Sequence, residues 1–181
     1  AHNDGLFTLV PAASASLDSM HDDRRLFSPS TERNRTYILP ILQRVLPAAA
    51  EVLEVGSGTG EHAVYFCAHI EGLRWQPTDA DPAAIDSILA WISHSALSRI
   101  AMPLELDLQS ASWPVQRADA IVAINVLHYS PWSSTPALFH GAARVLSENG
   151  IVFCYGPYLR DNAHTTASNV AFDDWLHEID P

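Results

Sequence analysis

Residues 52–60 read Val-Leu-Glu-Val-Gly-Ser-Gly-Thr-Gly, and the rest of the chain is arranged around them. The apolar residues before the first glycine form the short run expected of a parallel β-strand that is buried on both faces. The three glycines allow positive φ values and let backbone N–H groups approach a ligand closely. A helix is expected from about 61 to 70, and its first turn offers further unpaired N–H groups. The pattern predicts a site for a nucleotide-type cofactor.

The spacing of the glycines narrows the choice of cofactor. A dinucleotide fingerprint has the form G-x-G-x-x-G, but its third glycine position is occupied here by Glu61. The glycines instead give G-x-G-x-G, and an acidic residue stands two positions before the first of them. This arrangement resembles the first motif of class I S-adenosylmethionine (SAM) dependent methyltransferases. The resemblance implies that SAM is the cofactor and that the motif residues bind it: Glu54, Gly56, Ser57, Gly58 and Gly60.

The composition limits the classes of partner. The chain has 181 residues, which suffice for one domain with a sizeable core, and 48% of them are hydrophobic. The net charge of −11 argues against a nucleic-acid partner, because neutralising phosphates needs a surplus of Lys and Arg. We find no apolar run long enough to span a membrane, no metal-ligand spacing among the nine histidines and no disulfide framework from the two cysteines. We therefore expect a cytoplasmic protein without a bound metal.

The methyltransferase-like domain is expected to begin at Met20 and to run to the end of the chain, as a single domain over 20–181. Residues 1–19 are rich in Ala and Ser and lack a helical or strand period, so they are expected to be a disordered or foreign arm. The first helix of the domain is expected over 33–46, where apolar residues recur at helical spacing. Pro40 falls inside this helix and is expected to kink or restart it.

Two aspartates follow the second expected strand, which covers 73–79. Asp79 lies about 20 residues beyond the glycines, where an acidic residue is expected to accept hydrogen bonds from a ribose. Asp81 precedes Pro82 and is better suited to cap the helix expected over 82–95. We therefore assign Asp79 to the ribose and Asp81 to the helix cap.

The third expected strand, over 101–106, leads directly to Asp107 and Leu108. In class I methyltransferases an acidic residue at this place reads the adenine amino group, and an apolar neighbour packs on the adenine ring. The resemblance therefore implies these two roles for Asp107 and Leu108.

The fourth expected strand, over 118–124, ends at Asn125, and polar and aromatic residues follow it. This segment flanks the crevice in which open α/β sheets bind their ligands, so we predict Asn125 as a cofactor-binding residue. His128 is the best candidate for a catalytic base, since a histidine pKa can lie near neutrality. The alternative is a structural histidine that anchors the loop. His164 and Tyr129 are the next candidates for the base.

The remaining elements complete the expected sheet. A helix over 135–146 is expected to close with a left-handed residue at Asn149-Gly150, followed by a fifth strand over 151–155 and a helix over 169–178. The order of elements predicts an α/β fold: a Rossmann-like class I methyltransferase sheet, mostly parallel, in three αβα layers. The final two strands of such a sheet are missing. The chain is then either a C-terminal truncation or a shortened form whose fifth strand is an exposed edge.

A finer resemblance is carried by several short segments. They look like the methyltransferase-like protein 26 family, which is known as a domain of unknown function and is presumed to depend on SAM. The segments are Arg24 to Asn34, Gly58 to His62, Asn125 to Trp132, Gly156-Pro157-Tyr158, His164-Thr165 and Ser168 to Asp173.

The function expected from these features is methyl transfer from SAM to a small-molecule nucleophile. Such a protein must mainly align the methyl donor with the acceptor and exclude water. One alternative is a non-catalytic module that binds SAM or a partner. A weaker alternative is an NAD-dependent oxidoreductase, which Glu61 and the complete lack of lysine oppose. The acceptor and the oligomeric state stay open.

Overall fold

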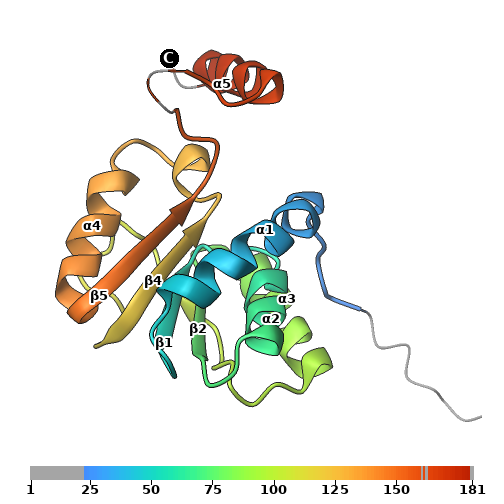
Figure 1. Ribbon diagram of the computed structural model, residues 1–181, viewed down its shortest axis with the longest axis vertical. Coiled ribbons are helices and arrows are strands. Elements are labelled where there is room, and N and C mark those ends of the chain that lie inside the picture. Colours follow the sequence, from blue (N-terminus) through green and yellow to red (C-terminus); the bar gives the residue numbers. More distant parts are fainter. Residues whose placement is uncertain (1–22, 160, 162, 180–181) are drawn as a thin grey trace, which may run out of the picture.

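The computed structural model of the chain describes residues 23–159, 161 and 163–179, so the expectation for residues 1–19 lies outside the described residues. Figure 1 shows a sheet with helices on both faces. In chain order the elements are α1 (Pro29–Val45), β1 (Glu51–Val55), α2 (Glu61–His69), β2 (Arg74–Asp79), α3 (Pro82–Ser95), β3 (Leu104–Glu105), β4 (Ala118–Ile124), a 3₁₀ turn (Leu127–Tyr129), α4 (Ser134–Val145), β5 (Leu146–Tyr155) and α5 (Ala167–Ile179).

The sheet has five parallel strands in the order β3-β2-β1-β4-β5, with β1 in the centre. The predicted Rossmann-like α/β fold is thereby confirmed, including the reduced number of strands. The strand order reverses between β1 and β4, and ligands bind at such a switch point, outside the carboxyl ends of the strands. Because the strands are parallel, the residues that follow each of them meet along one edge of the sheet.

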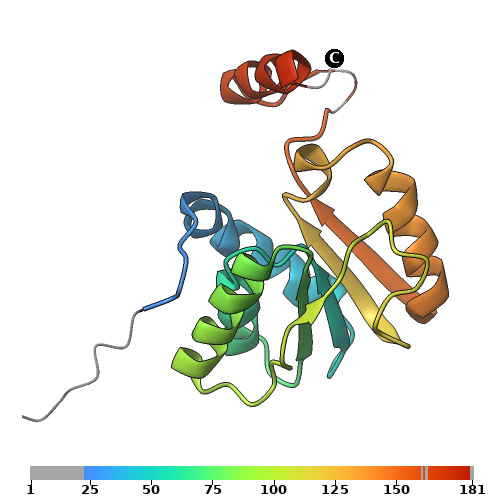
Figure 2. The ribbon, with the colours of Figure 1, turned by 180° about the vertical axis from the view of Figure 1, so that it is seen from behind.

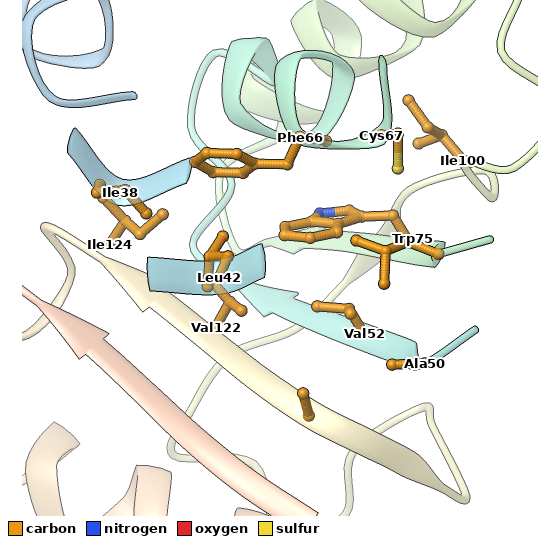
Figure 3. Packing of buried hydrophobic residues seen from close by; sticks show 13 residues of the cluster. Ile38, Leu42, Ala50, Val52, Phe66, Cys67, Trp75, Ile100, Val122 and Ile124 are labelled. Carbon is orange, nitrogen blue, oxygen red and sulfur yellow. The ribbon is translucent and has the colours of Figure 1, made fainter. Parts of the chain in front are cut away.

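One face of the sheet packs against α1 and α2. Its core combines Ile38 and Leu42 of α1, Phe66 of α2, and Val52 and Trp75 of the sheet, each at most 1% exposed. Figure 3 shows the Phe66 ring and the Trp75 indole facing each other in this layer, with ring centroids 5.8 Å apart. This packing holds β1 and β2 against the two helices.

The opposite face packs against α4 and the segment that precedes β4, as the reverse view in Figure 2 shows. Leu138 and Val145 of α4 and Trp113 of the preceding segment belong to this second core cluster. Trp113 lies directly against Gly141, where a Cβ would overlap the indole ring. A long loop with one buried tryptophan thus covers part of the sheet beside α4.

Several elements follow their sequence prediction closely. The strand before the glycines is β1, the helix after them is α2, and β4 covers 118–124 as expected. Helix α3 begins and ends where it was predicted, and the Ala83 N–H donates to the Asp81 carboxylate at 2.9 Å. Asp81 is therefore the predicted cap. Helix α5 covers the predicted 169–178 and extends beyond it at both ends.

Helix α1 starts one turn earlier than the predicted residue 33. Pro29 occupies its first turn, and the Ser28 hydroxyl accepts a hydrogen bond from the Thr31 N–H at 3.4 Å. Proline suits the first turn of a helix because its missing N–H would be unpaired there anyway. Pro40 lies inside the helix, which continues past it to Val45.

The prediction for the junction between α4 and β5 was wrong. Helix α4 ends at Val145 and β5 begins at the next residue, so Asn149-Gly150 does not close the helix. Asn149 has a φ of +64° and lies inside β5, where the pairing with β4 shifts between Ala118 and Ala120. The left-handed residue therefore forms a bulge in the strand, which the local sequence does not distinguish from a helix end.

Strand β3 is shorter than the predicted 101–106, with two residues only. On the neighbouring strand, the Trp75 N–H donates to the Arg99 carbonyl, toward the side of β3. Pro77, two residues further on, directs its nitrogen to the same side and has no N–H to donate. Pairing with β3 accordingly resumes only at Thr78 and Asp79.

The last two elements are loosely covered. Strand β5 is an edge in the described sheet, and all ten of its residues keep some exposed surface. Helix α5 lies beyond the carboxyl ends of β4 and β5, apart from the three layers (Figure 1). Among the residues that the structure describes, no helix combines the length and apolar character needed to cross a membrane.

Candidate functional site

The glycine loop has the conformation predicted from its sequence. Gly56, Gly58 and Gly60 have φ values of +64°, +55° and +90°. A Cβ on Gly56 would lie 2.8 Å from the Val126 side chain, and one on Gly60 would lie 2.9 Å from the Ile88 Cα of α3. A Cβ on Gly58 would meet nothing within 4 Å. Gly56 and Gly60 are thus required by packing, whereas Gly58 faces open space.

Hydrogen bonds connect the loop to the end of β2. The Ser57 N–H donates to the Thr78 carbonyl at 2.8 Å, and the Thr78 N–H donates back to the Ser57 hydroxyl at 3.1 Å. The Gly58 N–H donates to one Asp79 carboxylate oxygen at 2.8 Å, while the other oxygen accepts from the Asp81 N–H at 3.0 Å. Asp79, which was predicted to bind the ribose, therefore lies beside the open side of Gly58.

The other predicted cofactor residues lie along the same edge of the sheet. Asp107 is exposed in the loop after β3, and its carboxylate accepts from the Gln109 N–H at 2.9 Å. Leu108 packs against the core cluster beneath α4. Asn125 directly follows β4 with a φ of +57°, and its N–H donates to the Tyr155 carbonyl at 2.8 Å. The structure thus places Asp107 and Leu108 after the carboxyl end of β3 and Asn125 after that of β4.

Glu54 differs from the other predicted ligands because it is enclosed. It is 1% exposed, and its carboxylate accepts a hydrogen bond from the Trp75 indole N–H at 2.9 Å. Burial raises the pKa of Glu54 to about 7, and the nearby Asp79 charge acts in the same direction. The Glu54 carbonyl also accepts from the Thr78 hydroxyl at 2.7 Å. Glu54 thus lies beneath the glycine loop and braces β1 against β2.

Helix α1 is attached to the glycine loop by two contacts. The Ser28 N–H donates to the Glu61 carboxylate at 2.6 Å, and the Thr59 hydroxyl donates to the same carboxylate at 3.0 Å. The buried His62 ring is 2.8 Å from the Asn34 side-chain oxygen, and burial lowers the pKa of His62 to about 4. His62 is therefore neutral at pH 7 and donates to Asn34. Glu61, which occupies the third glycine position of a dinucleotide fingerprint, thus anchors α1 through Ser28.

A cavity of about 700 Å³ lies between α1, the carboxyl ends of β4 and β5, and α5. Volumes of this size are typical of small-molecule sites. Asn125 and His128 line it, whereas the glycines, Asp79 and Asp107 lie further along the edge and are not among its described lining residues. The full lining is Ser30, Arg33, Asn34, Tyr37, Asn125, His128, Tyr129, Cys154, Tyr155, Gly156, Pro157, Tyr158, Thr165, Thr166, Ser168, Asn169 and Phe172.

His128 lines this cavity. Its Nδ1 atom is buried and has no hydrogen-bond partner among the described residues. Burial lowers the pKa of His128, so the ring is neutral at pH 7 and carries a lone pair. The ring packs against Tyr129 and Phe172 with centroid distances of 4.6 and 5.4 Å. A neutral imidazole with a free nitrogen is what a catalytic base requires.

The two other candidates for the base are placed differently. Tyr129 lines the cavity and is 67% exposed. His164 lies outside the lining, with its Nε2 3.3 Å from the Asp173 carboxylate. Within the described residues, no group of three or more His, Cys, Asp or Glu side chains could hold a metal ion.

Sequence reasoning missed the part of the cavity that α1 and α5 supply. Ser30, Arg33, Asn34 and Tyr37 lie on one face of α1, and Phe172 comes from α5. Their spacing of three and four residues was readable along α1. The segment Glu32-Arg33-Asn34 was noted only for its family resemblance, and nothing local indicates that α5 returns to this edge.

Comparison with known proteins identifies both a family and a fold. The family model that matches is described as a protein of unknown function (DUF938), and it covers residues 25–181. Several solved structures with the same fold are methyltransferases. The SAM-dependent methyltransferase SibL has a TM-score of 0.66 and 22% identity over 80% of this chain. CalO1, a methyltransferase in calicheamicin biosynthesis solved with S-adenosylhomocysteine (SAH), has a TM-score of 0.64 and 20% identity over 81%.

A third solved structure, an O-methyltransferase family protein from Burkholderia thailandensis, has a TM-score of 0.61 and 20% identity over 82% of this chain. These identities show a shared fold and no more. The present chain spans 41%, 43% and 45% of the three matched chains, so it is similar to less than half of each.

Proposed function

The chain belongs to the DUF938 family of proteins of unknown function, and we propose that it is a SAM-dependent methyltransferase that acts on a small-molecule nucleophile. The observation that carries the proposal is the pairing of Gly58 with Asp79. An N–H group, a carboxylate and open space come together there, at the switch point of a methyltransferase fold. The finer kinship with the methyltransferase-like protein 26 family is part of the proposal and rests on the segments quoted for it.

The residues present suit the cofactor. Asp79 accepts hydrogen bonds from the ribose hydroxyls, because a carboxylate offers more lone pairs than the Gly58 and Asp81 N–H groups use. Asp107 accepts from the adenine amino group, with Leu108 against the ring. Gly58, without a Cβ, leaves room for the amino-acid part of SAM. Glu54 acts through the loop that it supports, since Trp75 encloses its carboxylate.

The bound cofactor supplies an electrophilic methyl group on a sulfonium centre. The protein holds the acceptor in the cavity beside Asn125 and His128 and shields it from water. Neutral His128 takes the proton of the acceptor on its imidazole ring as the acceptor becomes bonded to the methyl group. The polar neighbours on α1 and α5 orient the acceptor.

Calorimetry with SAM, SAH and NAD tests the proposal. We expect SAM and SAH to bind and NAD not to bind, because the buried Glu61 occupies the position of a third glycine and is held by Ser28 and Thr59. Asp79→Asn should weaken SAH binding by about ten-fold, since hydrogen bonds to a charged group contribute about 1.5–3 kcal/mol. Asp86→Asn, an exposed carboxylate paired with Arg24, is the matched control and should bind normally.

The non-catalytic module is the second candidate, and one observation favours it. Strand β5 is an uncovered edge in the described sheet, where a partner could bind. SAH binding by a protein that never consumes SAM with any acceptor would support this candidate. Binding of NAD in preference to SAM would contradict both.

A further inference from the structure

The cavity beside His128 has an unusual charge for this chain. The sequence contains 21 acidic residues and ten basic ones. No carboxylate is present among the described residues that line the cavity, and Arg33 is the one lining side chain with a permanent charge. The described lining of this cavity therefore carries no negative charge, although the protein as a whole is acidic. A cavity of this kind favours an anion over a cation.

Arg33 is available for a ligand. It is exposed on α1, and no carboxylate of the described residues lies within ion-pair distance of it. Four other arginines do form such pairs: Arg24, Arg25, Arg74 and Arg117. A guanidinium group can bind a carboxylate through two parallel hydrogen bonds.

The attachment of α1 fixes the position of Arg33. The contacts of Ser28 with Glu61 and of Asn34 with His62 flank Arg33 on both sides in the sequence. The backbone that carries Arg33 is therefore tied to the glycine loop by groups that are themselves buried or partly buried. The backbone of Arg33 is thus fixed beside the cavity, which its side chain lines.

The opposite wall of the cavity is aromatic. Phe172 of α5 lies edge-on to the Tyr129 ring at 5.6 Å and to the His128 ring at 5.4 Å. Both orientations are among those that aromatic rings prefer. The remaining polar lining comes from neutral hydroxyl and amide groups, such as Thr165 and Asn169, whose side chains bond each other at 2.9 Å. A planar apolar group is therefore favoured beside His128, and a charged group is favoured only near Arg33.

Building on the proposed methyl transfer, we infer that the acceptor is a small aromatic molecule that carries a carboxylate. Its ring packs on Tyr129 and Phe172, its carboxylate binds Arg33, and its hydroxyl or amino group lies near His128. In the reaction, a lone pair of this group forms the bond to the methyl carbon. The carbon–sulfur bond breaks with its electron pair returning to sulfur, and the proton goes to His128.

Three probes test the charge preference: 4-hydroxyphenylacetate, 4-hydroxyphenylacetamide of the same shape, and tyramine of similar length. They share a phenol ring and differ in charge, being an anion, a neutral molecule and a cation. Binding is measured by calorimetry on the SAH-saturated protein. We expect the anion to bind about five-fold or more tightly than the amide, and tyramine to bind most weakly. This ratio allows for the exposure of Arg33, which weakens a charge-assisted contact relative to a buried one.

Two variants of α1 test whether Arg33 causes the preference for the anion. Arg33→Gln should reduce the ratio between anion and amide to about one. Arg44→Gln removes the same charge from the last turn of the same helix, outside the cavity, and should leave the ratio unchanged. SAH affinity is measured for both variants and should equal that of the natural protein.

Three results would overturn the inference without touching the proposed function. These are the absence of carboxylate binding at millimolar concentration, equal binding of anion and amide, and equal effects of the two variants. Loss of SAH affinity in Arg33→Gln would also overturn it, because Arg33 would then serve the carboxylate of the methyl donor. Failure of the natural protein to bind SAH would instead remove the proposed function itself.

Discussion

The glycines of the loop differ in their surroundings, so single substitutions should separate their roles. Gly60→Ala forces a non-glycine residue to a φ of +90° and presses a Cβ onto the Ile88 backbone. We expect a loss of about 3 kcal/mol in the free energy of unfolding, from the strained φ and the overlap together. Gly58→Ala carries the φ penalty alone and should cost about 1 kcal/mol. Urea unfolding measures both.

SAH binding to the same two variants distinguishes packing from ligand contact. Gly58 faces open space in the unliganded fold, so Gly58→Ala should weaken SAH binding strongly although it disturbs the fold little. Equal losses of stability in the two variants would contradict the packing role of Gly60.

Glu54 should make the stability of the protein depend on pH. Its pKa is raised from 4.5 to about 7 by burial, so the folded protein holds a proton that the unfolded chain releases. The stabilisation from this proton is complete below pH 4.5 and is lost as the pH rises through 7. A rise in pKa of this size corresponds to about 3 kcal/mol.

Glu54→Gln isolates this contribution, because glutamine keeps an oxygen acceptor for the Trp75 N–H and does not ionise. Between pH 5 and pH 8, the free energy of unfolding should fall by about 3 kcal/mol more in the natural protein than in the variant. The lowered pKa of His62 acts in the opposite direction, but it is common to both proteins and cancels in the difference. Parallel pH profiles from urea titrations would show that Glu54 is charged in the folded state.

At the scale of the element, α1 depends on one buried hydrogen bond. Asn34→Ala leaves the His62 ring without its partner, and an unpaired buried polar group costs about 1–3 kcal/mol. Thr36→Ala, at an exposed position on the same helix, is the control and should change stability by less than about 0.5 kcal/mol. Thermal or urea unfolding checks the pair, and similar stability in the two variants would mean that α1 is held by its apolar face alone.

The elements that the sequence predicted well are those whose signals are local. The apolar run of β1, the Asp81-Pro82 start of α3 and the continuous strand β4 each lie within a few residues of the chain. The junction after α4 was missed because Asn149-Gly150 suits a bulge as well as a helix end, and only the pairing with β4 decides. The start of α1 was placed one turn late although Ser28-Pro29 is a local start signal, because the apolar periodicity used for the helix begins only further along the chain.

The residues of the candidate site also fall into two groups: those that the sequence could place and those that it could not. The glycines and Asp79 could be placed from spacing, since they follow two consecutive strands, β1 and β2, that pair side by side. The enclosure of Glu54 could not, because Trp75 reaches it only through the pairing of β1 with β2. Helix α5 contributes to the cavity because of the path that the chain takes after β5. No single residue between β5 and α5 predicts that path.

At the scale of the molecule, the two flanks of β5 should differ in amide hydrogen exchange. The Tyr155 carbonyl accepts from Asn125 on the β4 side, so by alternation the Val152 and Cys154 N–H groups point to the outer side. We expect these two amides to exchange at least ten-fold faster than those of Ile151 and Phe153, because no described strand covers them.

Residue-resolved exchange by NMR makes this measurement, with β4 as the internal control because it is paired on both sides. Uniformly slow exchange along β5 would contradict an open flank and would reveal a further strand or a second copy of the chain on it.

The bond between the Gly58 N–H and Asp79 has a kinetic consequence. The loop that would receive the methyl donor is already folded back onto the neighbouring strand before any ligand arrives, so capture needs no slow rearrangement of the backbone. The rate at which the methyl donor binds to the protein is then governed by diffusion and by the entrance of the crevice. We expect any slow conformational step of the proposed reaction to involve α5, which lines the cavity but lies apart from the three layers.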